Sequence, residues 1–305
     1  MREHPLMLGL VGASGSGKTT LTQGIVRLLG AHGVTPVNLD DYLRYSRAER
    51  AVRGMTDADP AAMDLNRMAA DLVALRAGQT IEKPVYDHTI GEPRGSERVA
   101  PTGLVIAYGA LTLTPPVQVE LFDLTVYFDP HPALYRRWRE ERDVLQRGYT
   151  LAEVQAAWPA RERDIQQYIV VQRPLADVVV RFVPGETGID LRLLLRRRAL
   201  TFDDGTMLGR KPESSAVQIQ QLAADEDGLP AVLVTATSDP ALDRLSEALR
   251  ARLPRSGQVT GDSLNATHPT LRFAQTLIAA LLLYKSLRRT FLQVGEGIVF
   301  AYRMR

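Results

Sequence analysis

The chain has 305 residues, a formal net charge of +2 and no cysteine. So small a net charge gives no strong attraction for a polyanion, so nucleic acid is not expected as a partner, and the missing cysteine excludes disulfides, thiol catalysis and cysteine-ligated metals. Residues 277–284, the longest late apolar stretch, are too few to span a bilayer, and the N-terminus lacks a signal-peptide pattern, so we expect a soluble, cytoplasmic protein with no membrane contact.

Residues 12–19 read Gly-Ala-Ser-Gly-Ser-Gly-Lys-Thr, the pattern of a phosphate-binding loop. Residues 6–11 predict a buried strand before it and 20–29 an amphipathic helix after it, which is the order the loop requires. The glycines let backbone N–H groups converge on an anion, while a glycine-rich turn without a ligand is the alternative. The expected ATP-binding residues are Gly12, Ser14, Gly15, Ser16, Gly17, Lys18, Thr19 and Thr20, with Lys18 toward the β- and γ-phosphates and the Thr19 hydroxyl toward Mg²⁺.

A second strand is predicted at 34–39, and it delivers Asp40 and Asp41 at its carboxyl end. Ligands of open parallel sheets bind at that edge, so these acids could act as a base or hold Mg²⁺ through water. Turn formation or helix capping is the equally weighted alternative. Residues 42–56 carry four arginines without an apolar period, which predicts either a mobile loop facing an anionic substrate or a solvated charged face.

Asp59 and Pro60 predict a helix start, with an apolar stripe that continues to Gly78. Residues 83–91 are predicted to be a polar loop containing His88, a residue that by itself is more often structural than catalytic. Residues 103–107 predict a central strand. Such a strand commonly ends in an acid that helps to hold Mg²⁺, but here Tyr108 follows it.

Residues 124–128 predict another strand, and 129–132 start a helix on which Leu134, Trp138 and Leu145 are expected to face inward. Thr150 and Glu153 form a capping box for the next helix. Strands are further predicted at 178–183, 191–202, 229–236 and 298–302, and helices at 239–253 and 269–287. The helix that starts at 129–132 has a separate face with four charged residues at spacings of three or four: Arg139, Arg142, Asp143 and Arg147. These residues could belong to a site, or they could simply form a salt-bridged surface.

Taken together, residues 6–183 resemble the phosphoribulokinase and uridine kinase family, and within it the phosphoribulokinases. The similarity rests on Leu-Asp-Asp-Tyr at 39–42, Asp-Pro at 59–60, Lys-Pro-Val-Tyr-Asp-His at 83–88 followed by Gly91, and the segments 138–143, 147–150 and 172–178. A fainter similarity at 265–281 extends it toward the C-terminus. The resemblance implies an α/β P-loop kinase core at 1–184, a mostly parallel sheet flanked by helices, with an α+β extension at 185–305 packed on it.

The resemblance also implies an ATP- and Mg²⁺-dependent kinase that phosphorylates a hydroxyl of a small phosphorylated sugar, with ribulose 5-phosphate as the leading acceptor, and a possible homodimer. Phosphoryl transfer depends mainly on positioning and charge neutralisation, which arginines supply. By motif position the catalytic residues are Asp40, Lys18 and Asp143, the acceptor-binding residues are Arg47, Tyr86, His88, Arg142 and Arg147, and the Mg²⁺ ligands are Thr19, Asp40 and Asp41.

Four positions depart from the family pattern: Leu43 replaces a histidine, Ala51 a lysine, Arg139 a lysine and Tyr108 a glutamate. These changes remove positive charge and an acid near the metal. They leave two alternatives open beside the sugar-phosphate kinase. One is a kinase for a nucleoside or another small alcohol, and the other is a catalytically impaired regulator that still binds nucleotide.

Overall fold

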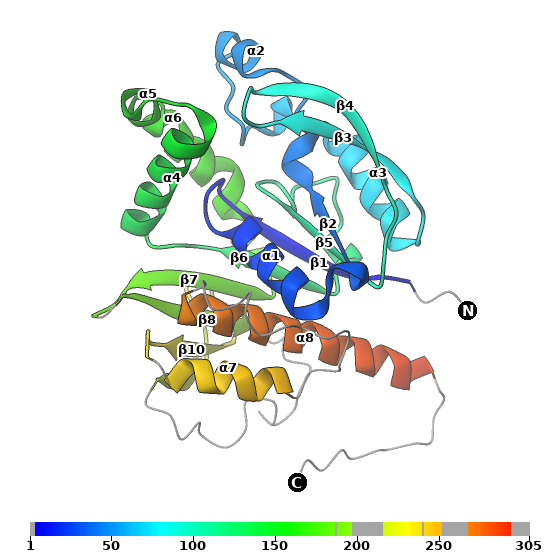
Figure 1. Cartoon of the computed structure of the whole chain (residues 1–305), viewed down its shortest axis with the longest axis vertical. Helices are drawn as coiled ribbons and strands as arrows, with labels where there is room; N and C mark the ends of the chain where they lie inside the picture. Colours follow the sequence, from blue (N-terminus) through cyan, green and yellow to red (C-terminus); the bar gives the residue numbers. More distant parts are fainter. Residues whose placement is uncertain (1–3, 187, 197–215, 240, 252–267, 294–305) are drawn as a thin grey trace.

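An eight-stranded sheet in the order β2-β5-β1-β6-β7-β8-β10-β9 forms the centre of the fold (Figure 1). The computed structural model describes residues 4–186, 188–196, 216–239, 241–251 and 268–293. The first five strands run parallel and the last three antiparallel, which confirms the predicted mostly parallel α/β architecture. The strands are β1 (Leu6–Gly12), β2 (Val34–Asn38), β5 (Leu104–Gly109), β6 (Leu124–Phe128), β7 (Val178–Pro184), β8 (Ile189–Arg196), β9 (Val217–Leu222) and β10 (Ala231–Ala236).

The side chains of β1 alternate between two cores, one on each face of the sheet. Leu8 and Leu10 pack in the cluster that includes α1 (Lys18–Leu29) and α8 (Pro269–Gln293). Met7 and Val11 pack in the opposite cluster, with α3 (Leu65–Arg76). A strand has a side-chain period of two, so a strand made of apolar residues throughout must be covered on both faces.

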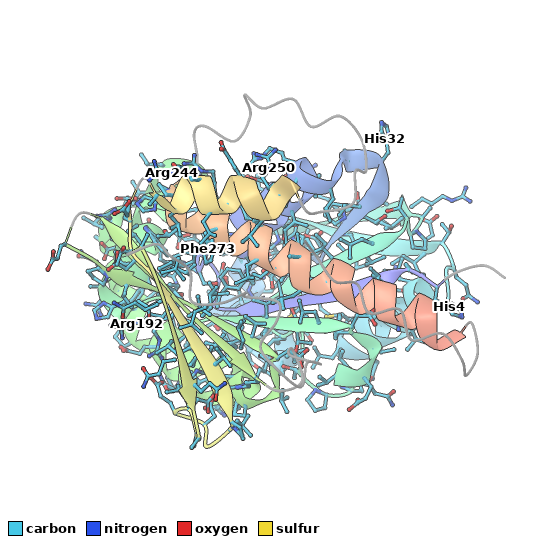
Figure 2. The ribbon with its side chains drawn as sticks, turned by 90° about the horizontal axis from the view of Figure 1, so that it is seen from below. His4, His32, Arg192, Arg244, Arg250 and Phe273 are labelled. Atoms are coloured by element: carbon cyan, nitrogen blue, oxygen red, sulfur yellow. The ribbon has the colours of Figure 1, made fainter. Side chains whose placement is uncertain are left out.

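Helix α8 lies across the α1 face of the sheet, beside α7 (Ala241–Ala251) (Figure 2). Its own residue Phe273 is buried in the core on that face. The side chain of Gln275 sits over Gly24 of α1, where a Cβ atom would lie only 2.0 Å from it. Gln275 Nε2 also donates a hydrogen bond to the Thr20 carbonyl at 3.2 Å. Helix α8 thus packs against the helix that follows the glycine-rich loop. No helix in the described ranges combines the length and apolar character needed to cross a membrane.

Three predictions about the segments before β5 were wrong. The loop predicted at 42–56 contains α2 (Arg47–Val52), which begins with a capping box between Ser46 and Glu49. The loop predicted at 83–91 is largely β3 (Ile81–Asp87), paired with β4 (Glu92–Val99). β4 is exposed along nearly its whole length, so it has no apolar alternation to reveal it. Asp59 and Pro60 start only a single 3₁₀ turn, and α3 begins after Asp64 caps it.

The predicted inward face of α4 (Pro132–Arg147) was wrong at one position. Leu134 is buried and Trp138 packs on the core, but Leu145 is 79% exposed. Toward its C-terminal end the helix instead buries Arg139 and Asp143, because they face the glycine-rich loop rather than the sheet. The capping box of Thr150 and Glu153 is confirmed at the start of α5 (Leu151–Ala156), which α6 (Trp158–Asp164) follows.

Among the later elements, the strand predicted at 229–236 is confirmed as β10 and the helices at 239–253 and 269–287 as α7 and α8. The strand predicted at 191–202 is confirmed as far as Arg196, and its remainder, like 298–302, lies outside the described residues. The sequence did not predict β9, because most of its side chains are exposed at the edge of the sheet and carry no apolar pattern.

Candidate active site

The loop between β1 and α1 forms a tight cradle of backbone. Gly15 and Gly17 have φ of +92° and +106°, a left-handed conformation that glycine adopts without strain. At Gly12 a Cβ atom would lie 2.9 Å from both the Phe128 Cβ and the Ser16 Oγ, so a side chain there would push the loop off the adjacent strand. The Lys18 ammonium folds over the loop and donates to the carbonyls of Gly12 (2.7 Å) and Ala13 (3.1 Å).

The groups around this cradle fit a polyphosphate. Thr19 and Thr20 are exposed in the first turn of α1, where the unpaired N–H groups and the helix dipole favour an anion. The Ser16 hydroxyl is buried and has no hydrogen-bond partner among the described residues. Burial lowers the pKa of Lys18 to about 8, although Asp40 raises it in part. A buried, partly destabilised ammonium gains the most from an approaching anion, which is the demand that the phosphates of ATP would satisfy.

We expect ATP binding to take up about one proton at pH 9 and almost none near pH 6.5, because phosphates restore the charge of an ammonium whose pKa is about 8 without ligand. Titration calorimetry in two buffers of different protonation enthalpy measures this uptake. The variant Lys18→Met should bind ATP more weakly and show no such dependence on pH. Equal proton uptake by both proteins at pH 9 would show that another group titrates.

The two aspartates after β2 have different surroundings. Asp40 Oδ1 accepts a 2.8 Å hydrogen bond from the Ala110 N–H, beyond the end of β5. Gly109 permits this approach, since a Cβ there would lie 3.1 Å from Asp40 Oδ1. Asp41 is buried and engaged by the Lys83 ammonium at 2.5 Å and by His88 Nε2 at 3.2 Å. Asp40 is therefore the acid that retains coordination capacity toward the pocket.

Tyr108 is the next-to-last residue of β5 and lies near both aspartates. Burial, together with the neighbouring charges of Asp41 and Asp40, raises the pKa of its phenol to about 12. The phenol is therefore neutral at physiological pH and supplies no charge to a metal, which leaves the carboxylate of Asp40 as the nearby acid with an accessible edge.

A group of arginines from α4 covers the glycine-rich loop. Arg139 Nη1 donates to the Ser14 carbonyl at 2.8 Å, and Arg142 Nη1 lies 3.1 Å from the Ser14 hydroxyl. Between them, fully buried Asp143 accepts from Arg139 Nε at 2.7 Å and from Arg142 Nη2 at 2.7 Å. Burial alone would raise the pKa of Asp143, but the two guanidinium groups lower it. Burial and the adjacent Arg139 and Arg147 lower the pKa of Arg142 to about 10.

The structure adds two site residues that sequence reasoning did not select, Asp57 and Arg161. Asp57 Oδ2 lies 3.6 Å from Arg139 Nη2, and Arg161 Nη2 lies 3.6 Å from Asp143 Oδ2. Burial would raise the pKa of Asp57, but the surrounding guanidinium groups hold it well below its ordinary value. Their signal in the sequence is weak, because Asp57 lies in an irregular segment and Arg161 shares the short helix α6 with Arg163. Charged residues in such places are common on protein surfaces.

One pocket joins these parts. Its wall is polar on the side of Ser14, Asp40 and His88, and apolar at Leu43, Ile165 and Ile169. Asp57, Arg139 and Arg161 also line it. Residues predicted from the family resemblance and residues identified only from the structure therefore line one pocket beside the phosphate cradle.

Of the predicted acceptor-binding residues, only His88 lines this pocket, and the other four lie outside the lining: Arg47, Tyr86, Arg142 and Arg147. Arg47 Nη2 donates to the His88 carbonyl at 3.1 Å, and its guanidinium lies over the Tyr149 ring, 4.4 Å from the ring centroid. The Tyr86 hydroxyl is buried between Arg50 Nη1 and the Gly91 carbonyl, both at 2.7 Å. These contacts fix α2 against the β3–β4 turn that presents His88. The Arg147 side chain makes no hydrogen bond within the part of the chain that the structure describes, but its charge acts on Asp57 and Arg142.

The parallel sheet, the glycine loop after β1 and the charged pocket beside it define a P-loop kinase. Residues 7–187 match the model of the phosphoribulokinase/uridine kinase family, and the chain belongs to that family. Members of the family are phosphotransferases that act on hydroxyl groups, and they use ATP.

Relatives of both kinds are similar in sequence. The phosphoribulokinase of Synechocystis sp. is 32% identical over 223 residues, 69% of this chain and 67% of that protein. The chloroplastic phosphoribulokinase of Triticum aestivum is 29% identical over 201 residues, 60% of this chain but only 50% of that protein. The uridine kinase of Ligilactobacillus salivarius is 31% identical over 198 residues, 63% of this chain and 92% of that protein. The chain thus spans between about half and two-thirds of the first two relatives.

Among solved structures, phosphoribulokinase from Rhodobacter spheroides superposes with a TM-score of 0.60 at 15% identity. The match covers 94% of this chain and all of that one. At this identity the comparison shows the shared fold alone.

Proposed function

We propose that this chain transfers the γ-phosphoryl group of MgATP to a hydroxyl of a phosphorylated sugar, with ribulose 5-phosphate as the first candidate. The observation that carries the proposal is that Asp40, Arg139 and Arg161 line one pocket beside the phosphate loop. A sugar phosphate needs both a base for its hydroxyl and cations for its phosphate, and this pocket supplies them together.

The residues divide the work as follows. Asp40, oriented by the Ala110 N–H, accepts the proton of the attacking hydroxyl. Lys18 and Arg142 stabilise negative charge on the transferring phosphoryl group, while Asp143 holds Arg142 in place. The hydroxyl of Thr19 would hold Mg²⁺ directly and the carboxylate of Asp40 would hold it through water, and the ion would neutralise phosphate charge.

A nucleoside kinase is the second candidate, and one observation favours it. The pocket wall formed by Leu43, Ile165 and Ile169 is apolar, which suits the flat face of a base better than a second phosphate. The carboxylate of Asp57 could then accept hydrogen bonds from ribose hydroxyls. Leu43 and Ala51 also stand where the family pattern has a histidine and a lysine, so the site has fewer positive charges to attract an anionic acceptor.

A panel of acceptors separates the two candidates. We expect ribulose 5-phosphate to increase ATP consumption. Removing the phosphate from the acceptor should lower kcat/KM by at least about tenfold, because a charge-assisted pair is lost. The measurement is ADP release coupled to a spectroscopic readout. Turnover with uridine but not with any sugar phosphate would favour the second candidate. ATP binding without turnover of any acceptor would point to a regulator.

A further inference from the structure

Gln172 is a buried side chain that the proposed chemistry does not use directly. It lies in the 3₁₀ turn Val170–Leu175 ahead of β7 and is 2% exposed. Its Nε2 donates to the carbonyls of Ala110 (2.9 Å) and Tyr168 (2.8 Å), and its Oε1 accepts from the Leu113 N–H at 2.9 Å. The amide is thus fully engaged, and two of its three bonds go to the loop that follows β5.

That loop is the one that orients Asp40. The Ala110 N–H donates to Asp40 Oδ1 at 2.8 Å, while the Ala110 carbonyl accepts from Gln172. Thr112 Oγ1 ties the same turn to the Leu10 carbonyl of β1 at 2.8 Å. Gln172 therefore bonds to the carbonyl of Ala110 and Asp40 bonds to its N–H, so a shift of Ala110 moves the Asp40 carboxylate as well.

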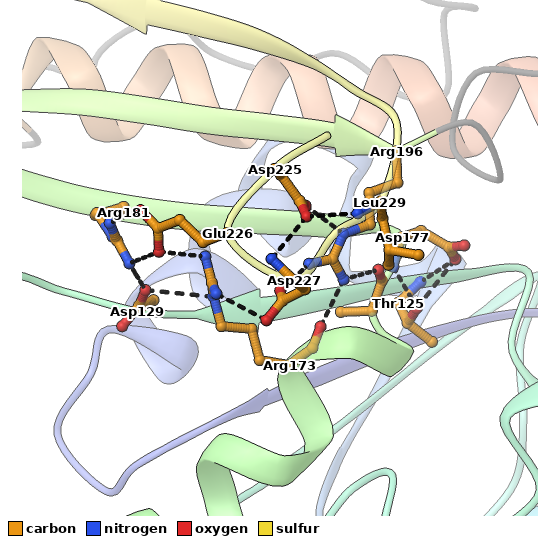
Figure 3. Close-up of polar contacts among 11 residues, drawn as sticks. Thr125, Asp129, Arg173, Asp177, Arg181, Arg196, Asp225, Glu226, Asp227 and Leu229 are labelled. Atoms are coloured by element: carbon orange, nitrogen blue, oxygen red, sulfur yellow. Dashed lines mark hydrogen bonds and ion pairs between the residues drawn. The ribbon is translucent and has the colours of Figure 1, made fainter. Parts of the chain in front are cut away.

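Arg173, the residue after Gln172, is itself anchored to the C-terminal strands, as Figure 3 shows. Arg196, at the end of β8, donates to the Arg173 carbonyl at 2.6 Å and to the Ala176 carbonyl at 2.8 Å. The Arg173 side chain pairs with Glu226 and Asp227, each at 2.9 Å, in the turn between β9 and β10. The residue next to Gln172 is thus held by charged groups from outside the region that carries the kinase motifs.

We infer that Gln172 is a positioning residue for Asp40, acting through Ala110. The inference rests on the proposed function, because it matters only if Asp40 accepts the proton of the acceptor. Proton transfer requires the base within hydrogen-bond reach of the hydroxyl, and a displacement of about 1 Å at a reacting group can cost on the order of 100-fold in rate. The hydrogen bonds of Gln172 go to Ala110, Leu113 and Tyr168 and not to the glycine-rich loop, so ATP binding is not expected to depend on it.

The test compares Gln172→Glu with the parent enzyme in steady-state kinetics. Glutamate keeps the shape and the acceptor for Leu113, but it turns an oxygen toward the carbonyls of Ala110 and Tyr168. We expect kcat to fall by roughly tenfold or more while the KM for ATP stays unchanged. Gln172→Met, which removes all three hydrogen bonds without adding charge, provides a second variant if the glutamate variant does not fold, and the same split is expected.

Thr125→Val is the matched control. Thr125 is equally buried, lies on the neighbouring strand β6 and exchanges hydrogen bonds of 2.9–3.0 Å with Asp177, but it makes none to the Ala110 turn. It should lower the melting temperature and leave kcat intact. An equal fall of kcat in Thr125→Val, or an unchanged kcat in both Gln172 variants, would overturn the inference. If Asp40→Asn also retained turnover, the proposed base itself would be wrong, whereas a crippled Asp40→Asn beside active Gln172 variants would leave the proposed function standing.

Discussion

Replacing Asp40 by asparagine is expected to lower kcat by roughly 100-fold or more, the usual size of a base contribution. The amide keeps the shape of the side chain and can still accept from the Ala110 N–H, so the pocket should not rearrange. It cannot take up the proton of the attacking hydroxyl. Steady-state kinetics measures the fall, and calorimetry should find ATP affinity little changed, because Lys18 and the loop backbone remain.

The control for this substitution is Asp59→Asn. Asp59 accepts from the Ala61 N–H at 2.9 Å in an exposed turn, a role that asparagine can also fill, so turnover should stay at the parent value. Unimpaired turnover in Asp40→Asn would contradict the assignment. Asp41 would then be the next candidate, although Lys83 and His88 already engage its carboxylate.

The second large effect is expected at Asp143. Asparagine in its place removes the counter-charge of Arg142 and leaves the buried guanidinium of Arg139 with only the more distant Asp57, at 3.6 Å. The free energy of unfolding should therefore fall by about 3–5 kcal/mol. The native pKa of Asp143 lies below its ordinary value. Its stabilising effect is therefore present above the ordinary carboxyl pKa and is lost only as the pH falls through the native value. The variant should differ from the parent at pH 7 but approach it in strong acid.

Denaturant titration measures this difference, with Asp164→Asn as the control. Asp164 is also buried, but it pairs with one exposed arginine, Arg163, at 3.3 Å and with the Thr56 hydroxyl at 2.7 Å, so its loss should cost less. ATP should restore more stability to Asp143→Asn than to the control, because phosphates supply anionic charge beside Arg142. Equal destabilisation by both substitutions would show that Asp143 does not organise the arginines.

The sequence determined the features that depend on local order. The apolar run before Gly12 and the spacing Gly-x-x-x-x-Gly-Lys-Thr require a strand, a loop of backbone N–H groups and a helix, whatever the rest of the chain does. Asp40 could be placed at a strand end for the same reason, since the carboxyl ends of parallel strands share one edge. Capping by Thr150 and Glu153 is equally local, and the structure has it as predicted.

Only the tertiary structure decided which charges meet. Asp57, Arg139 and Arg161 are far apart in sequence, and nothing in their local patterns distinguishes them from residues on a solvated surface. Exposed strands such as β4 and β9 form because a neighbouring backbone is available for pairing, which leaves no side-chain period to read. The burial of Asp143 and the exposure of Leu145 follow from where α4 lies over the loop, because a helix buries the face that meets another element, whether that face is apolar or charged.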